Sequence, residues 1–192
     1  MKRFIENLKY LKQQLSTKYE QKIARILFNY SIKLSTAESC TGGLLSSRLT
    51  DIAGSSSYTK ENFVTYANEA KIELLDVSPQ TIEKYGAVSE ECASEMAEGL
   101  FNRTHCDIAI SITGVAGPTT PEKDKPVGLA FVAIKNKYTN QTAKIEVDPH
   151  HNRKIIKYLF TQKALEILHE FLLKNYTEAT KQLYESTNQD TV

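Results

Sequence analysis

A serine and a cysteine, Ser39 and Cys40, stand side by side in a polar turn that ends in two glycines, Gly42 and Gly43. The turn follows the apolar run at residues 32–35 and precedes a helix-like run at residues 44–49, as at the junction of a strand and a helix. Because a helix start leaves N–H groups unpaired and its dipole favours negative charge, the pattern predicts a pocket for a small anion. Ser39 is the first candidate nucleophile, although a serine in such a turn also commonly caps the helix.

A base must remove the proton of a serine hydroxyl before the oxygen can attack a carbonyl group, and histidine or neutral lysine usually does so. The best-placed lysine is Lys71, in the first turn of a helix that we expect Asn68 to cap. The helix dipole and partial burial would both lower the pKa of an ammonium group there. Tyr66 is available nearby as a proton donor or orienting hydroxyl. From spacing alone, however, a solvated surface position is the favoured interpretation of Lys71.

A loop rich in glycine and proline begins at Thr113 and Gly114, directly after a predicted strand at residues 107–112. Long loops of this kind often carry function, and open α/β sheets bind ligands at the carboxyl ends of their strands. We therefore expect three segments to converge at one edge of the sheet: residues 39–43, 66–71 and 113–117.

Other reactive residues are weaker candidates. Cys40 ranks below Ser39 because no histidine is suitably placed to activate it, and buried inert thiols are common. Arg153 opens the last predicted helix and is either a bidentate ligand for phosphate or carboxylate or an ordinary surface arginine. The four histidines lack the spacing of a metal site, so we expect no bound metal.

The elements that must position these residues alternate between strand and helix patterns. Helical periodicity covers about the first thirty residues, and the further predicted helices lie at residues 43–51, 68–75, from 78, 89–102 and 151–173. Strands are predicted at residues 32–36, 63–66, 107–112, 127–134 and 142–147. This order indicates an α/β fold, a three-layer α/β/α sandwich with a mixed, mostly parallel sheet.

Composition narrows the class of protein. Lys and Arg number 24 against 23 Asp and Glu, with no block of like charge, which argues against nucleic-acid or membrane-surface binding. The three cysteines are widely spaced, as in a reducing compartment, and no apolar run approaches membrane-spanning length. We expect a cytoplasmic protein that binds no nucleic acid and no membrane.

Six motifs in order resemble the CinA carboxy-terminal domain family, the nicotinamide-nucleotide amidases: TAESCTGG at 36–43, DIAGSS at 51–56, FVTYANEAK at 63–71, GAVS at 86–89, SITGVAGP at 111–118 and KPVG at 125–128. The resemblance places the amidase domain at residues 19–173, after an amphipathic helical extension at residues 1–18 and before a polar tail at residues 174–192. It implies a three-layer α/β/α domain without metal or organic cofactor, and the extension suggests a homo-oligomer contact.

The resemblance also implies an activity, the deamidation of nicotinamide mononucleotide to nicotinate mononucleotide and ammonia. Ser39 is then the nucleophile and Lys71 its general base, with Tyr66 and Thr113 assisting. The expected substrate-binding residues, for a small-molecule nucleotide, are Thr41, Gly42, Gly43, Asn68, Gly114 and Arg153. We expect the phosphate at the turn of residues 41–43 or at Arg153.

An alternative function is a nucleotide-binding or partner-binding module with weak or lost amidase turnover. It is motivated by departures from the family pattern and by the family's association with competence and DNA damage. Glu61 and Asn62 stand where the family often has glycine, and residues 119–122 replace a glycine-rich segment. His151 and Lys157 replace a frequent glycine and a frequent arginine.

Overall fold

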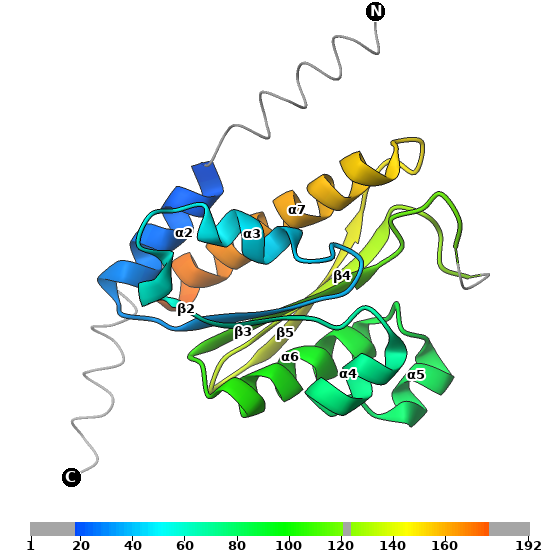
Figure 1. Cartoon of the computed structure of the whole chain (residues 1–192), viewed down its shortest axis with the longest axis horizontal. Helices are drawn as coiled ribbons and strands as arrows, with labels where there is room; N and C mark the ends of the chain where they lie inside the picture. The colour runs from blue at the N-terminus through cyan, green and yellow to red at the C-terminus, as the bar shows by residue number, and fades with distance from the viewer. Residues whose placement is uncertain (1–17, 121–123, 177–192) are drawn as a thin grey trace, which may run out of the picture.

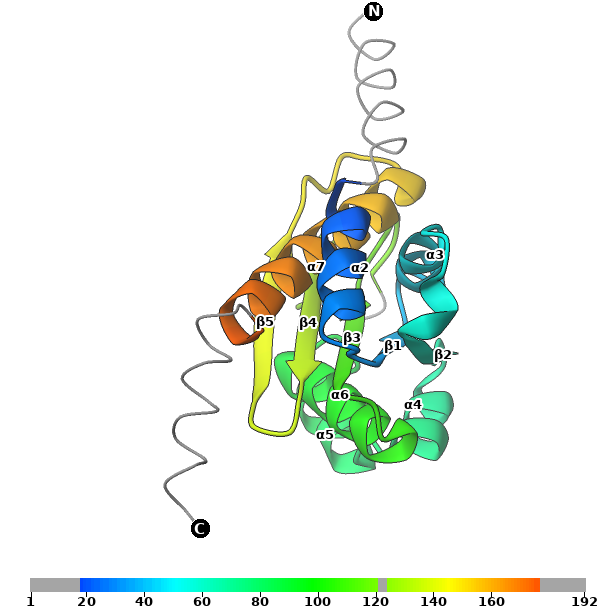
Figure 2. The same ribbon diagram turned by 90° about the vertical axis from the view of Figure 1, so that its left-hand side faces the viewer.

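Five strands form one sheet in the order β2-β1-β3-β4-β5 in the computed structural model, which describes residues 18–120 and 124–176. Figure 2 shows this order across the sheet, with helices on both faces. The strands are β1 (Leu34–Glu38), β2 (Thr59–Val64), β3 (Ile108–Gly114), β4 (Leu129–Lys135) and β5 (Asn140–Glu146). β1 pairs in parallel with β2 and β3, whereas β4 runs antiparallel to β3 and β5.

The helices divide into two layers (Figure 1). One face of the sheet carries α2 (Lys18–Asn29), α3 (Leu44–Thr50) and α7 (Arg153–Asn175), and the other carries α4 (Asn68–Leu75), α5 (Pro79–Tyr85) and α6 (Glu90–Thr104). A short 3-10 turn, η1 (Ser55–Ser57), leads into β2. The predicted three-layer α/β/α fold with a mixed sheet is therefore confirmed, and parallel and antiparallel pairings contribute equally to the described sheet.

The sheet centre is covered on both faces. All five residues of β1 are buried, as are the first six of β3, because helices cover both sides of these inner strands. α6 packs so tightly on α4 that a Cβ at Gly99 would lie 1.7 Å from the Leu75 carbonyl oxygen. This packing holds α4 closely against α6.

A buried ion pair anchors α3 to its neighbours. Arg48 Nη2 lies 2.6 Å from Glu20 Oε1, and both side chains are almost fully buried. The same guanidinium donates to Thr161 Oγ1 and Gln162 Oε1 of α7, which satisfies a charge that would otherwise be costly to bury. α2, α3 and α7 are thereby joined through one side chain.

Helix boundaries follow their predicted caps in part. Pro79 opens α5 as expected, and the Ser89 hydroxyl accepts from Cys92 N at the start of α6. The expectation that Asn68 caps α4 is wrong: extended Ala67 holds the cap position, its carbonyl accepts from Lys71 N, and Asn68 is the first helical residue.

The predicted terminal segments lie mainly outside the described residues. Of the helical pattern in the first thirty residues, residues 18–29 form α2, while residues 1–17 are outside the description. The polar tail beyond residue 176 is also outside it. Across the described ranges, no helix combines the length and the apolar character needed to cross a membrane.

Candidate active site

Ser39 and Lys71 meet at the carboxyl end of the parallel half of the sheet. Ser39 follows β1 directly, and its N–H donates to the Ile112 carbonyl of β3 at 3.0 Å. Lys71 lies one turn into α4, which follows β2, and its Nζ is 3.2 Å from Ser39 Oγ. The convergence of the two residues follows from the pairing of β1 with β2, since the carboxyl ends of parallel neighbours reach the same edge.

The Lys71 side chain is buried, with 1% of its surface exposed, so the solvated surface position is excluded. Its Nζ turns back toward the segment before α4 and donates to the carbonyl oxygens of Thr65 at 2.9 Å and Tyr66 at 3.3 Å. Burial lowers the pKa of this amine below its usual 10.5, since the charged form loses solvation. A lowered pKa favours the neutral amine that a general base requires.

Cys40 also faces the pocket, but its thiol is poorly suited to attack. It is buried, and burial first and the nearby charge of Glu38 second raise its pKa to about 12. Because the thiolate is the reactive form, a thiol with this pKa is almost entirely protonated near neutral pH. The preference for Ser39 over Cys40 therefore has a physical basis.

The start of α3 does not offer the unpaired N–H groups that the sequence predicted. The carboxylate of Glu38, itself fully buried, accepts from Gly43 N at 3.1 Å, Leu45 N at 2.9 Å and Ser46 N at 2.8 Å. The Ser46 hydroxyl adds a fourth contact at 2.7 Å. The protein's own carboxylate thus occupies the position proposed for a ligand anion, and the premise of an anion pocket at this turn is wrong.

A pocket of about 230 Å³ opens beside the Ser39–Lys71 pair. Of the residues predicted for the site, those that line it are Ser39, Tyr66, Asn68, Lys71, Thr113, Gly114 and Arg153. The predicted turn residues Thr41, Gly42 and Gly43 are not among its lining residues. All three predicted segments therefore contribute to the pocket. The segment at residues 39–43 contributes only Ser39 and Cys40, and the segment at residues 66–71 contributes residues just before and inside α4.

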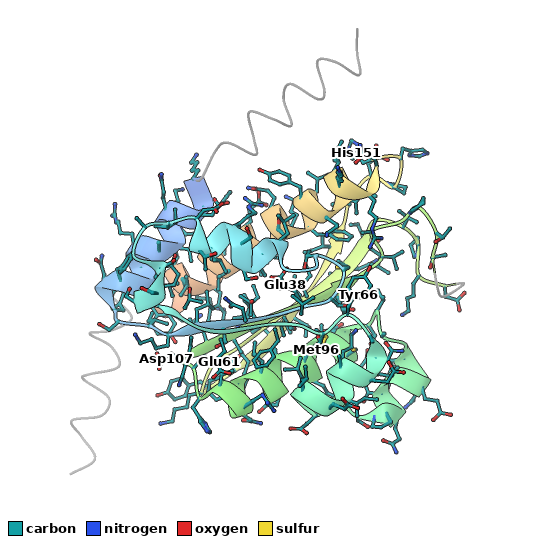
Figure 3. The ribbon with its side chains drawn as sticks, in the orientation of Figure 1. Glu38, Glu61, Tyr66, Met96, Asp107 and His151 are labelled. Atoms are coloured by element: carbon teal, nitrogen blue, oxygen red, sulfur yellow. The ribbon has the colours of Figure 1, made fainter. Side chains whose placement is uncertain are left out.

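Arg153 links two segments that line the pocket. Its Nη1 donates to the Gly117 carbonyl at 2.7 Å, and its Nη2 donates to the Tyr66 hydroxyl at 2.6 Å. Figure 3 shows Tyr66 at the end of the sheet opposite Asp107, with His151 beyond the start of α7. The Tyr66 hydroxyl thus serves Arg153 and not Lys71, which is contacted by the Tyr66 backbone carbonyl.

The end of β3 and the loop before α6 complete the wall. The Thr113 hydroxyl donates to the Ala87 carbonyl at 2.7 Å and so ties the end of β3 to the loop before α6. Gly114 permits a close approach of β4, because a Cβ there would lie 2.7 Å from the Leu129 carbonyl oxygen. Val88, Val115 and Ala116 add apolar surface to the same pocket.

Sequence reasoning missed two contributors, the Glu38 carboxylate and the Ala87–Val88 wall. A carboxylate placed five residues before the N-cap, Gly43, was a usable signal, because acidic groups stabilise helix N-termini. Ala87 and Val88 carry no chemical signature, so only the fold reveals them. The described residues include no group of three or more His, Cys, Asp or Glu side chains arranged to hold a metal ion.

Comparison with known proteins finds the same family by a family model and by individual relatives. The model of the CinA C-terminal domain matches residues 16–172. A putative competence-damage inducible protein of Alkaliphilus oremlandii is 46% identical over 154 residues, which are 80% of this chain and 37% of that protein. The chain thus spans little more than a third of the length of this relative.

Solved structures agree with the fold. A CinA superfamily protein from Klebsiella pneumoniae has a TM-score of 0.79 and 31% identity, over 82% of this chain and 98% of the other. A competence/damage inducible protein from Agrobacterium tumefaciens has a TM-score of 0.73 and 38% identity, over 78% of this chain and 93% of the other.

Proposed function

Because the chain belongs to the CinA C-terminal domain family, we propose that it is an amidase that converts nicotinamide mononucleotide to nicotinate mononucleotide and ammonia. The observation that carries the proposal is the 3.2 Å contact between Ser39 Oγ and the buried Lys71 Nζ. A serine within reach of a lysine whose pKa is lowered by burial is a combination suited to acyl transfer. The choice of substrate rests on the family resemblance.

The reaction proceeds through an acyl-enzyme. Neutral Lys71 takes the proton of Ser39 as Oγ forms a bond to the carboxamide carbon, and the carbonyl oxygen becomes an oxyanion stabilised by nearby backbone N–H groups. The Lys71 ammonium gives its proton to the amide nitrogen as the tetrahedral intermediate collapses, so the C–N bond breaks and the nitrogen leaves as ammonia. Water then attacks the ester with Lys71 again as base, which releases the acid and restores Ser39.

The remaining pocket residues support binding of a nucleotide. Val88, Val115 and Ala116 offer apolar surface for the pyridine ring. Arg153 and Asn68 lie on the same pocket as polar partners for the ribose and phosphate. With the start of α3 occupied by Glu38, we assign the phosphate to Arg153 and not to the turn of residues 41–43.

Product identification tests the proposal. The purified chain is incubated with nicotinamide mononucleotide, ammonia is measured, and the acid product is identified by mass spectrometry. We expect Ser39→Ala and Lys71→Ala to abolish turnover, while Cys40→Ala, a change at the next residue of the same turn, retains it. Undiminished activity in both dyad variants would remove Ser39 and Lys71 from the mechanism.

A second candidate is a nucleotide-binding module with weak or lost turnover. Two observations favour it: the similar relative is named for competence and damage, and residues 119–122 depart from the family's glycine-rich segment. Calorimetry that detects tight binding of nicotinamide mononucleotide, in a protein that releases no ammonia, would select this function over the amidase.

A further inference from the structure

Glu38 is the residue immediately before the proposed nucleophile, and its side chain is fully buried. Figure 3 places it between α3 and the sheet. Burying a carboxylate is costly unless hydrogen bonds replace its lost solvation. Here one oxygen accepts from Gly43 N and Leu45 N, and the other accepts from the backbone and the hydroxyl of Ser46. The start of α3 therefore provides hydrogen-bond donors to both carboxylate oxygens of Glu38.

The backbone of Glu38 connects the same residue to Lys71. Its carbonyl accepts from Thr65 N at 2.8 Å, and the Thr65 carbonyl in turn accepts from Lys71 Nζ at 2.9 Å. The backbone of Glu38 thus contacts Thr65, which holds Lys71 Nζ. Its side chain contacts the start of α3, the helix that follows the turn carrying Ser39.

We propose that Glu38 is a positioning residue that keeps Ser39 Oγ within reach of Lys71 Nζ, an inference that rests on the proposed amidase function. The turn of residues 39–42 is fixed at one end by β1 and at the other by α3, which the carboxylate holds. Loss of the carboxylate would free the α3 end of the turn and let Ser39 move. Even a small displacement of the nucleophile lowers the reaction rate, because the reaction requires an aligned approach. Glu38 does not touch the substrate, since it does not line the pocket.

Glu38→Gln is the first test. Glutamine has the same size, but it keeps only one acceptor oxygen. Its NH2 group would face N–H donors of α3 in place of the other oxygen, so the turn loses part of its anchor. We expect kcat to fall about 10- to 100-fold while KM stays within about threefold, since the pocket wall and Arg153 are untouched. An unchanged kcat in folded Glu38→Gln protein would overturn the proposal.

Glu20→Gln is the matched control. Glu20 is also a buried carboxylate, and it holds α3 through Arg48, away from the pocket. Its loss lowers the melting temperature, but we expect kcat to stay within about twofold of wild type below that temperature. Equal losses of kcat in the two variants would show a general effect of loosening α3 and would refute a specific role for Glu38.

Ser46→Ala tests the role of Glu38 even if Glu38→Gln does not fold. Ser46→Ala removes one of the four contacts to Glu38 with little risk to folding, and a smaller fall of about two- to fivefold in kcat is expected. If Glu38→Gln does not fold, an unchanged kcat in Ser46→Ala overturns the proposal.

The rate at which a fluorophosphonate modifies Ser39, forming the P–O bond and releasing fluoride, reports nucleophile positioning without the natural substrate. We expect slower labelling in Glu38→Gln and Ser46→Ala than in Glu20→Gln, with Ser39→Ala as the blank. If the wild type releases no ammonia, the proposed function fails, and these labelling rates still decide the role of Glu38. Equal rates in all three variants would refute it.

Discussion

Replacement of Lys71 by methionine separates the chemistry of the amine from the packing of its chain. Methionine is unbranched and fills similar space, but it carries no proton and no charge. Loss of the general base should lower kcat by about 10²- to 10⁴-fold. The same change should also alter how the stability of the protein depends on pH, because burial lowers the pKa of Lys71 in the folded state.

The sign and size of that dependence follow from proton linkage. The unfolded chain binds a proton at Lys71 below about pH 10.5, whereas the folded protein binds it only below its lowered pKa. Between these two values the unfolded state holds more protons, so the stability of the wild type rises with pH, by at most about 1.4 kcal/mol per pH unit. The stabilising contribution is complete above pH 10.5 and is lost as pH falls toward the folded pKa.

Urea unfolding at a series of pH values, for wild type and Lys71→Met, measures this effect. Other titrating groups cancel in the difference between the two proteins. The variant also loses the amine's contacts to Thr65 and Ser39. The test therefore compares how the free energy of unfolding changes with pH in the two proteins, and not its absolute value. A difference that stays flat, or falls with rising pH, would show that burial does not depress the pKa of Lys71.

Three shorter predictions concern other parts of the fold. Cys40→Ala should keep kcat within about twofold, and iodoacetamide should modify Cys40 in the native wild type only slowly at pH 8, because the thiol pKa is about 12; rapid labelling by mass spectrometry would contradict this. Arg48→Met should lower the free energy of unfolding by about 3–5 kcal/mol, since it leaves Glu20 buried and unpaired, as urea titration can measure. Gly99→Ala should cost more than about 4 kcal/mol, because its Cβ would lie 1.7 Å from the Leu75 carbonyl oxygen; a stable, soluble variant would show that α4 and α6 can separate.

The sequence was most informative where burial imposes a simple pattern. β1 and β3 are covered on both faces, so their apolar runs marked them within two residues. β2 was placed at residues 63–66 but spans Thr59–Val64, because it is an edge strand whose first residues, including Lys60, Glu61 and Asn62, are polar and largely exposed. An edge strand of this kind has little hydrophobic periodicity to detect.

The site was predictable to the extent that it follows from topology. Ser39 and Lys71 could be brought together from sequence because parallel neighbours end at the same edge of a sheet. Whether the N–H groups at the start of α3 are free to bind a ligand was not predictable in the same way. Its N–H groups are used by Glu38, a contact that depends on where one side chain turns, and spacing does not specify a rotamer.

The antiparallel half of the sheet offers a position where a label can be attached to this protein away from the pocket. β4 is seven residues long: it begins beside the pocket, where Ala130 pairs with Gly114, and ends at Lys135, at the far end of the sheet. The turn that follows exposes Tyr138. A fluorophore or a surface tether fixed at Tyr138 would therefore lie away from the pocket, so that ligand binding to immobilised molecules could be observed.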